Sequence, residues 1–272
     1  MAEHAGQVIR RREDPRLVTG AGQFVDDLPM PDCVHVAIVR SPHAHARLSA
    51  IDASAARRAP GVIAVVTGAD LGAVNAPLPV FLPHPGLPTP CGIRPLADER
   101  VRFVGEPVAA VVADDPYRAL DAAELVRVDY EPLPAVVEVE AAAMAGAPLV
   151  HEPLGTNVVA EWSQRVGDPA RALREADVVV RTTLRLARGG AHPLEPRGLL
   201  AQWRDGRLTV WATVQMVHRH QRMIAGQLGL DLAKVRVVAP ADVGGGFGTK
   251  GPYYPEDALV PALAIRLGRP VK

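Results

Sequence analysis

"VRVVAPADVGGGFGTK" (residues 235–250) joins a short β-branched run to a turn that contains four glycines. A run of this kind predicts a buried strand, so the sequence predicts a strand that ends in a glycine-rich turn. Because glycines 244–246 have no side chain, successive backbone N–H groups can approach a ligand closely and bind electron-rich groups. The alternative is a flexible turn without a ligand, and the glycines by themselves do not decide between the two.

Two familiar anion-binding loops do not fit this stretch. The phosphate-binding P-loop has Lys directly after its last glycine, whereas Thr249 separates Gly248 from Lys250. The dinucleotide fingerprint G-x-G-x-x-G, started at Gly244, meets Thr249 where its third glycine should stand. Nucleotide binding is therefore the weakest hypothesis for this turn.

Composition excludes several classes of protein. The chain has 272 residues, enough for one large domain or two ordinary ones, and its 30 basic residues balance its 30 acidic residues. This balance does not favour nucleic-acid binding, and no apolar run reaches the ~20 residues of a membrane span. Cys33 and Cys91 do not make a disulfide framework, and the N-terminus has no apolar signal region. We expect a cytoplasmic protein with no membrane span and no nucleic-acid partner.

The residue pattern mixes strands with helices, which predicts an α+β fold. β-Branched or alternating runs predict strands at 34–40, 62–67, 103–113, 126–132, 178–186 and 235–238. The dipeptides Asp115-Pro116 and Asp168-Pro169 are typical of helix starts, with Asp as the N-cap. An alanine-rich connector at 140–148 indicates a domain boundary.

The second half of the chain gives the clearest local predictions. Asp205-Gly206 lies between two β-rich runs and favours a tight hairpin turn. Val217, Ile224 and Leu228 share one face of a predicted helix that Gly229 can cap. A last helix has leucines at every fourth position, and we expect Pro261 to bend it or to shorten its first turn.

Several motifs accompany the glycine turn in a fixed order. They are "EDPRLVTGAGQFVDD" (13–27), "SPHAHARL" (41–48), "FVGEPVAAVVADDPYRALDAAELVRVDYEPLPAVV" (103–137), "HPLEPRG" (192–198), "LGL" (228–230), "DVGGGFGTK" (242–250) and "YPEDALV" (254–260). In this order and spacing the chain closely resembles the molybdenum-binding large subunit of the xanthine dehydrogenase and aldehyde oxidase family, which includes aerobic carbon monoxide dehydrogenase. The resemblance extends from about residue 12 to the last residue and covers only the N-terminal portion of that subunit.

The resemblance implies a domain order and a set of cofactor contacts. An N-terminal arm (1–16) would precede an α/β hammerhead domain (17–140) and the first part of a molybdopterin-binding domain (141–272). A molybdenum–molybdopterin cofactor would contact Gly245, Gly246, Phe247 and Gly248, and Gln215 would donate a hydrogen bond to a molybdenum oxygen. Backbone amides and a carboxamide suit the electron-rich atoms of such a group. The family usually has Ser or Thr before this Gln, and here that residue is Val214.

The resemblance also implies partners. Iron–sulfur (2Fe-2S) and FAD cofactors are expected on separate small and medium subunits, and the pterin is expected in its cytosine dinucleotide form. Family large subunits are several hundred residues longer, so we expect the catalytic base outside this chain and assign no catalytic residue within it. The chain would then be a component that is inactive without a C-terminal molybdopterin-binding partner or continuation. The alternative is a non-catalytic remnant or a hammerhead interaction module. The sequence does not indicate the substrate.

Other polar residues are weaker candidates. His43 and His45 could share a face of a strand, but no third metal ligand is near them, and we assign no metal site. His218 and His220 point in different directions on a helix, so we expect solvated or hydrogen-bonded side chains. Glu195 could lie near the cofactor or could pair with Arg197, and the sequence leaves both interpretations open.

Overall fold

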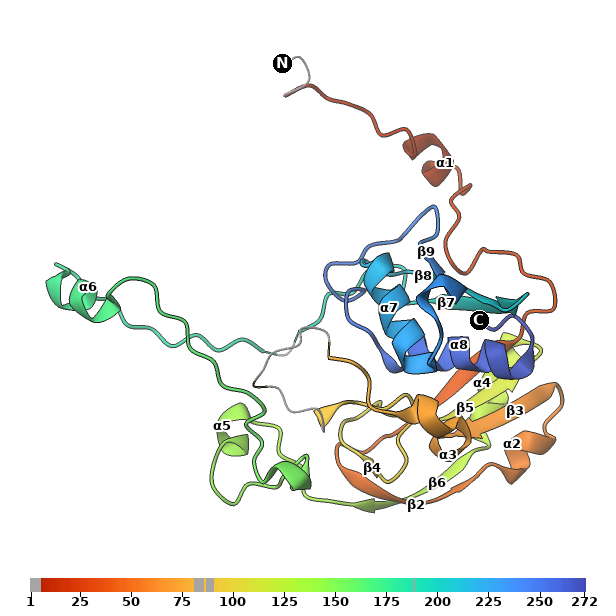
Figure 1. The fold of residues 1–272 in the computed structure, drawn as a ribbon, viewed down its shortest axis with the longest axis horizontal. Helices are drawn as coiled ribbons and strands as arrows, with labels where there is room; N and C mark the ends of the chain where they lie inside the picture. The colour runs from red at the N-terminus through yellow and green to blue at the C-terminus, as the bar shows by residue number, and fades with distance from the viewer. Residues whose placement is uncertain (1–5, 81–85, 87–90, 188) are drawn as a thin grey trace. The chain divides into compact units, whose positions relative to one another are not determined.

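The computed structural model describes residues 6–80, 86, 91–187 and 189–272. Two compact units make up these residues. One unit contains residues 37–191 and 253–255, and because it carries two sheets we call it the two-sheet unit. The other contains residues 6–36, 192–252 and 256–272, and we call it the glycine-turn unit. Figure 1 labels the elements of both.

Helices and strands alternate irregularly in the two-sheet unit. Its elements, with the first strand beginning just before the unit, are β1 (His35–Arg40), β2 (Ala46–Asp52), α2 (Ser54–Arg58), β3 (Val62–Thr67), α3 (Gly68–Leu71), η1 (Gly72–Asn75), β4 (Arg100–Val101), β5 (Pro107–Ala113), α4 (Pro116–Glu124), β6 (Arg127–Pro132), α5 (Val139–Ala142), η3 (Glu152–Leu154) and α6 (Pro169–Glu175). One sheet has the order β1-β5-β3 and the other the order β4-β2-β6.

The central strand β5 joins the cores of this unit, and all seven of its residues are buried. On one face, Ala109 and Val111 pack with Ala56 of α2 and Ala122 of α4. Val108 points the other way and packs in a cluster with Val101 of β4 and its neighbour Ala46 in β2. Because successive side chains of a strand point to opposite faces, one apolar strand serves both cores.

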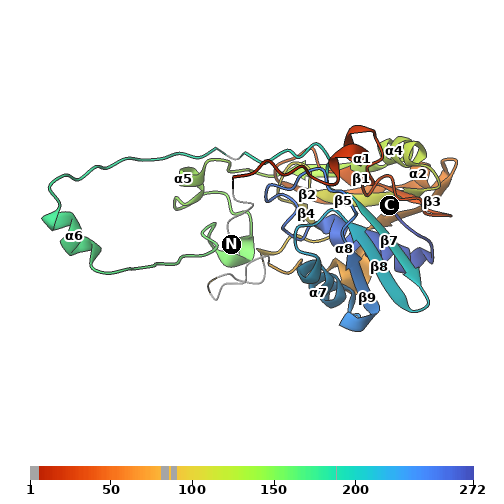
Figure 2. The same ribbon diagram turned by 90° about the horizontal axis from the view of Figure 1, so that it is seen from above.

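The glycine-turn unit is built on a three-stranded sheet. Its elements are α1 (Asp14–Val18), β7 (Leu199–Arg204), β8 (Arg207–Ala212), α7 (Val217–Leu228), η4 (Leu232–Lys234), β9 (Val235–Val238) and α8 (Pro255–Leu267), the last of which begins one residue before the unit. β7 and β8 form an antiparallel hairpin, and β9 pairs with β8 in parallel (Figure 2). α7 supplies the crossover that a parallel pair requires, and it packs against β9.

Local sequence signals place several elements as predicted. Asp205 and Gly206 both have positive φ angles, 51° and 72°, as a tight two-residue hairpin needs. Gly229 ends α7 in the left-handed conformation, with φ 64°. Asp115 caps α4 by accepting hydrogen bonds from the amides of Tyr117 and Arg118. These predictions are confirmed because each depends on contacts within a few residues.

Two predicted strands differ in the structure. β5 begins at Pro107 rather than at residue 103, because the chain turns at Gly105 (φ 92°). The buried carboxylate of Glu106 holds this turn by accepting a hydrogen bond from the Arg102 amide. The predicted strand at 178–186 is wrong for this chain, since these residues lie in no sheet.

The structure also bears on three features discussed from the sequence, which are the two cysteines, Pro261 and the length of the helices. Cys33 and Cys91 are both free thiols. Pro261 lies inside α8, which nevertheless runs for 13 residues. In the described ranges, no helix combines the length and hydropathy that a membrane crossing requires.

The α4 cap gives a first test of this fold. We expect Asp115→Ala to lower the free energy of unfolding by about 1 kcal/mol, because two amides of the first turn lose their acceptor. Asp121→Ala, an exposed change on the same helix, should alter it by less than about 0.5 kcal/mol. Urea denaturation of the two variants measures the difference, and equal effects would contradict the capping role.

Candidate functional site

The glycine turn follows β9 in the glycine-turn unit, as predicted. Gly245 and Gly248 have positive φ angles of 100° and 92°, and Phe247 also has a positive φ of 47°. Three left-handed residues within four positions curl the backbone into a nest, so that neighbouring N–H groups point toward the same side. The side chain of Phe247 is 76% exposed, which is unusual for a large aromatic group.

Three consecutive amides of this turn have no acceptor among the described residues. Within the described ranges, the N–H groups of Gly245, Gly246 and Phe247 make no hydrogen bond. Gly244 and Gly248 on either side donate to the side chains of Glu195 and Gln215, at 2.7 Å and 3.0 Å. The turn is therefore fixed at its two ends, and its middle can donate to a ligand.

Gln215 lies directly beside the turn. It follows β8, and its backbone amide donates to the carbonyl of Lys250 at 2.8 Å. Its side-chain Oε1 accepts from the Gly248 amide, so its Nε2 group is left to donate outward. The structure therefore places Gln215 next to Gly246 and Gly248, and a donor on Gln215 can act together with the three amides.

A single carboxylate holds both ends of the turn. Glu195 Oε2 accepts from the Gly244 amide at the start of the turn and from Lys250 Nζ at its end, both within 2.8 Å. The Lys250 side chain is fully buried, and Glu195 is 12% exposed. Burial strengthens such an ion pair but makes either charge costly without the other. Glu195 Oε1 is buried without a hydrogen-bond partner among the described residues.

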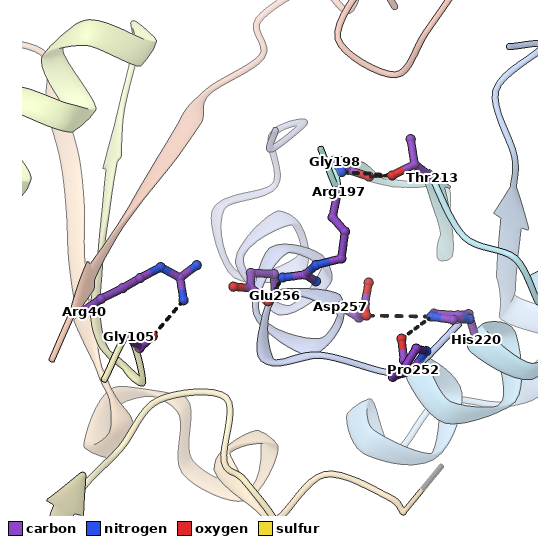
Figure 3. A network of polar contacts seen from close by, with 9 residues as sticks. All are labelled: Arg40, Gly105, Arg197, Gly198, Thr213, His220, Pro252, Glu256 and Asp257. Atoms are coloured by element: carbon purple, nitrogen blue, oxygen red, sulfur yellow. Dashed lines mark hydrogen bonds and ion pairs between the residues drawn. The ribbon is translucent and has the colours of Figure 1, made fainter. Parts of the chain in front are cut away.

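Of the two sequence interpretations of Glu195, the pairing with Arg197 is wrong. Arg197 instead forms an ion pair with Glu256 at 3.0 Å, at the start of α8. Figure 3 shows Arg197 and Glu256 together with Gly198, whose amide donates to the Thr213 hydroxyl at 3.0 Å. Sequence reasoning missed the Glu195–Lys250 pair because the two residues are 55 positions apart and no local pattern links them.

Close packing, in addition to the positive φ angle of Gly245, favours glycine at positions 244–246. A Cβ at Gly244 would lie 2.4 Å from Glu195 Cβ, and one at Gly246 would lie 3.0 Å from Gln215 Cδ. At Gly245 a Cβ would come within 2.7 Å of the Phe247 ring. A side chain would overlap Glu195 at Gly244, would be strained by the positive φ at Gly245 and would displace Gln215 at Gly246, which explains the run of glycine.

A groove of about 640 Å³ opens beside the first half of the turn. Gly244, Gly245 and Glu195 line it, together with Leu17 and Phe24 of the N-terminal segment. Its volume lies within the range of ~300–1,000 Å³ that is usual for small-molecule sites. The groove is thus large enough for an organic cofactor, and Gly245, one of the three residues with a free amide, lines it.

An acidic residue ties the N-terminal segment to this turn. Asp242, 7% exposed, pairs with the Arg16 guanidinium and accepts a hydrogen bond from the Gln23 amide at 2.7 Å. The hydrogen bond from Arg16 is the main reason that the pKa of Asp242 lies below its usual value, and the Gln23 amide adds to it. The carboxylate form therefore holds Arg16 and Gln23 against the start of the turn.

Among the described residues, the histidines are not grouped as metal ligands. His220 is buried on α7, and its ring lies 3.2 Å from the carbonyl of Met216. It also lies 3.2 Å from the carbonyl of Pro252 and 3.7 Å from Asp257, as Figure 3 shows. This agrees with the expectation of a hydrogen-bonded side chain. Within residues 6–80, 86, 91–187 and 189–272, no group of three or more His, Cys, Asp or Glu side chains is arranged to hold a metal ion.

Comparison with known proteins gives two domain matches. Residues 19–134 match the model of the α/β hammerhead domain of aldehyde oxidase and xanthine dehydrogenase. Residues 150–272 match the model of the molybdopterin cofactor-binding domain. The two matches follow each other along the chain and together include the glycine turn and Gln215.

Individual relatives extend over nearly the whole chain. The 6-hydroxypseudooxynicotine dehydrogenase complex subunit gamma of Paenarthrobacter nicotinovorans is 39% identical, and the alignment covers 98% of this chain and 34% of that protein. The carbon monoxide dehydrogenase large chain of Afipia carboxidovorans is 38% identical, covering 97% and 34%. The crystal structure of quinoline 2-oxidoreductase from Pseudomonas putida 86 superposes with a TM-score of 0.89, at 39% identity, over 98% of this chain and 34% of that one. The chain therefore spans about a third of the length of these relatives.

Packing of the turn can be tested through its glycines. Gly244→Ala should lower the free energy of unfolding by about 1–3 kcal/mol, because the new methyl group overlaps Glu195 and displaces the turn. Gly190→Ala is the matched control, since no atom lies within 4 Å of its Cβ position, and it should change stability by less than about 0.5 kcal/mol. Urea denaturation compares them, and a neutral Gly244→Ala would show that the turn does not pack against Glu195.

The low pKa of Asp242 predicts a pH dependence. A carboxyl whose pKa is lowered by folding contributes stability above its unfolded pKa of ~3.9, and that contribution is lost as the pH falls through the folded value. Asp242→Asn should therefore be less stable than the wild type at pH 7, and the difference should shrink below about pH 4. Unfolding curves at both pH values test this. Gln7→Ala, a change of an exposed group that does not titrate, is the control, and a gap for Asp242→Asn that stays constant with pH would contradict the role of the Arg16 pair.

Proposed function

Because the chain belongs to the family of aldehyde oxidase and xanthine dehydrogenase large chains, we propose that it forms one side of a molybdopterin site in a molybdenum hydroxylase-type oxidoreductase. It corresponds to the N-terminal third of its relatives. We therefore propose that activity needs the polypeptide corresponding to the other two thirds, as a continuation or as a separate chain. No residue of this chain is assigned as catalytic.

The observation that carries the proposal is the group of donors at the glycine turn. The amides of Gly245, Gly246 and Phe247 and the Nε2 group of Gln215 have no acceptor within the described part of the chain. A molybdopterin bears oxygen and sulfur atoms and a phosphate, all of which accept hydrogen bonds. Because these donors are already fixed before the ligand binds, binding requires little further loss of conformational entropy in the turn. The residues present therefore fit this cofactor.

We propose a distinct role for each part of this site. When bound, the cofactor would supply the metal-centred oxidation–reduction chemistry. Gly245 to Gly248 would bind it through the backbone, and Gln215 would orient one of its oxygens. Phe247 would lose its exposed surface against the cofactor and exclude water, which strengthens the neighbouring hydrogen bonds. Glu195 would keep the turn in its binding conformation.

Relatives support the proposed partners. Their names describe a complex subunit gamma, a large subunit and a large chain, so each is one component of a larger enzyme. We propose an iron–sulfur small subunit and an FAD medium subunit as partners, the cytosine dinucleotide form of the pterin, and a cytoplasmic location. The names of the relatives refer to different compounds, so we assign no substrate.

Cofactor retention tests the proposal. The chain is co-expressed with the C-terminal two thirds of the nicotine 6-hydroxylase large subunit of Paenarthrobacter nicotinovorans, a 36% identical relative, in a host that makes molybdopterin. Molybdenum and oxidised-pterin fluorescence should co-purify with the pair and be absent from the chain by itself. Gln215→Ala should reduce both by about tenfold, since one charge-assisted donor is lost.

Gln7→Ala removes an exposed carboxamide from the N-terminal segment and should have no effect on cofactor retention. A complex that forms but holds no pterin would refute the proposed function and favour a non-catalytic interaction module. Equal retention by Gln215→Ala and Gln7→Ala would refute the role of Gln215.

A further inference from the structure

Residues 177–187, "DVVVRTTLRLA", have the sequence of an amphipathic strand but lie outside every sheet. Val178, Val180, Leu184 and Leu186 are 78%, 83%, 81% and 93% exposed. Their spacing is a multiple of two, so in an extended backbone all four side chains lie on one face. An apolar face of this kind is normally buried against another layer of protein.

The opposite face of segment 177–187 already has polar partners. Arg185 forms ion pairs with Glu138 and Glu140, at 3.6 Å and 2.6 Å, beside α5. The face of Arg185 also carries Val179, which is 46% exposed, and it contacts the two-sheet unit through these ion pairs, whereas the apolar face is exposed. The two faces differ in the same way as the two faces of a half-buried strand.

The backbone of segment 177–187 is also unsatisfied. Within the described ranges, its N–H and C=O groups form no hydrogen bond with any other residue. Figure 1 draws it as coil, without a strand arrow, after α6. A row of free backbone donors and acceptors beside an apolar face is a template for pairing with another strand.

The segment on the other side of α6 repeats the pattern. Val158, Ala160 and Val166 are also separated by multiples of two, and Val158 and Val166 are 45% and 83% exposed. Two strand-like segments with exposed apolar faces therefore flank α6. The same pattern of exposed apolar side chains thus occurs in two segments, and this repetition indicates that another polypeptide covers the surface they form.

We propose that segment 177–187 is the docking strand for the polypeptide that supplies the remaining two thirds of the large chain. That polypeptide would add a strand along the segment and bury its apolar face, whether or not it is joined covalently to this chain. The inference rests on the proposed function, since it concerns the partner that completes the site. Relatives that include this segment are about three times as long as this chain, and their additional residues are the available source of a covering strand.

Association without cofactor tests this inference independently of pterin retention. The full chain is mixed with the separately purified C-terminal two thirds of the nicotine 6-hydroxylase large subunit, both free of molybdopterin, and the Kd is measured by calorimetry. Hydrogen exchange of amides 177–187 should be nearly unprotected in the chain by itself and slowed about 100-fold or more in the complex. Because no cofactor is present, a failure of molybdopterin binding does not affect this result.

Two adjacent substitutions provide the matched comparison. Leu184→Asp places a charge on the apolar face and should weaken association by at least about tenfold, because a buried unpaired charge is costly. Thr183→Asp adds the same charge on the polar face and should change the Kd by less than about twofold. Both side chains are exposed in the chain itself, so neither variant should shift its melting temperature.

Four outcomes would overturn the inference. The first is the absence of a complex, and the second is a complex in which amides 177–187 stay unprotected. The third is protection of these amides in the chain by itself together with a dimer in sedimentation, which would make a second copy the occupant. Equal effects of Leu184→Asp and Thr183→Asp on the Kd would also contradict an apolar docking face.

Discussion

The Glu195 carboxylate is the constraint on which the candidate site depends. It accepts hydrogen bonds from the Gly244 amide and the Lys250 ammonium group, and so it joins the start of the glycine turn to its end. Together with the hydrogen bond from the Gly248 amide to Gln215, this clamp fixes the part of the turn that carries the free amides of Gly245, Gly246 and Phe247. Because the Lys250 side chain is fully buried, its positive charge requires the negative charge of Glu195 nearby. Removing either side chain would leave the other charge buried without a partner.

This arrangement explains why the turn can be rich in glycine and still be ordered. Glycine loses much conformational freedom on folding, so several in a row would ordinarily destabilise a fixed conformation. Here side chains supply the order from outside the turn: Glu195, Lys250 and Gln215 hold its ends, and Asp242 links it to Arg16. Gly245 and Gly246 carry no side chain, and their backbone amides stay available to a ligand.

Two parts of the molecule present unsatisfied groups of different kinds. The glycine turn offers directed donors and a groove, as a site for a small polar ligand does. Segment 177–187 offers an apolar face and a strand edge, as a surface for another polypeptide does. The chain spans about a third of the length of its relatives, and under our two proposals other residues complete the site and cover the segment. The α+β fold and the family were accessible from the order of the motifs, and the domain matches support both.

The sequence by itself determined the elements that depend on neighbouring residues. The Asp205-Gly206 hairpin, the Asp115 cap and the end of α7 at Gly229 follow from φ preferences and side-chain reach over a few positions. Only the tertiary structure decided which partner Glu195 takes and whether residues 178–186 form a strand. Lys250 is 55 positions from Glu195, and strand formation needs a neighbouring backbone as well as a suitable composition. Such contacts depend on which distant segments the fold brings together, and the spacing of neighbouring residues does not predict them.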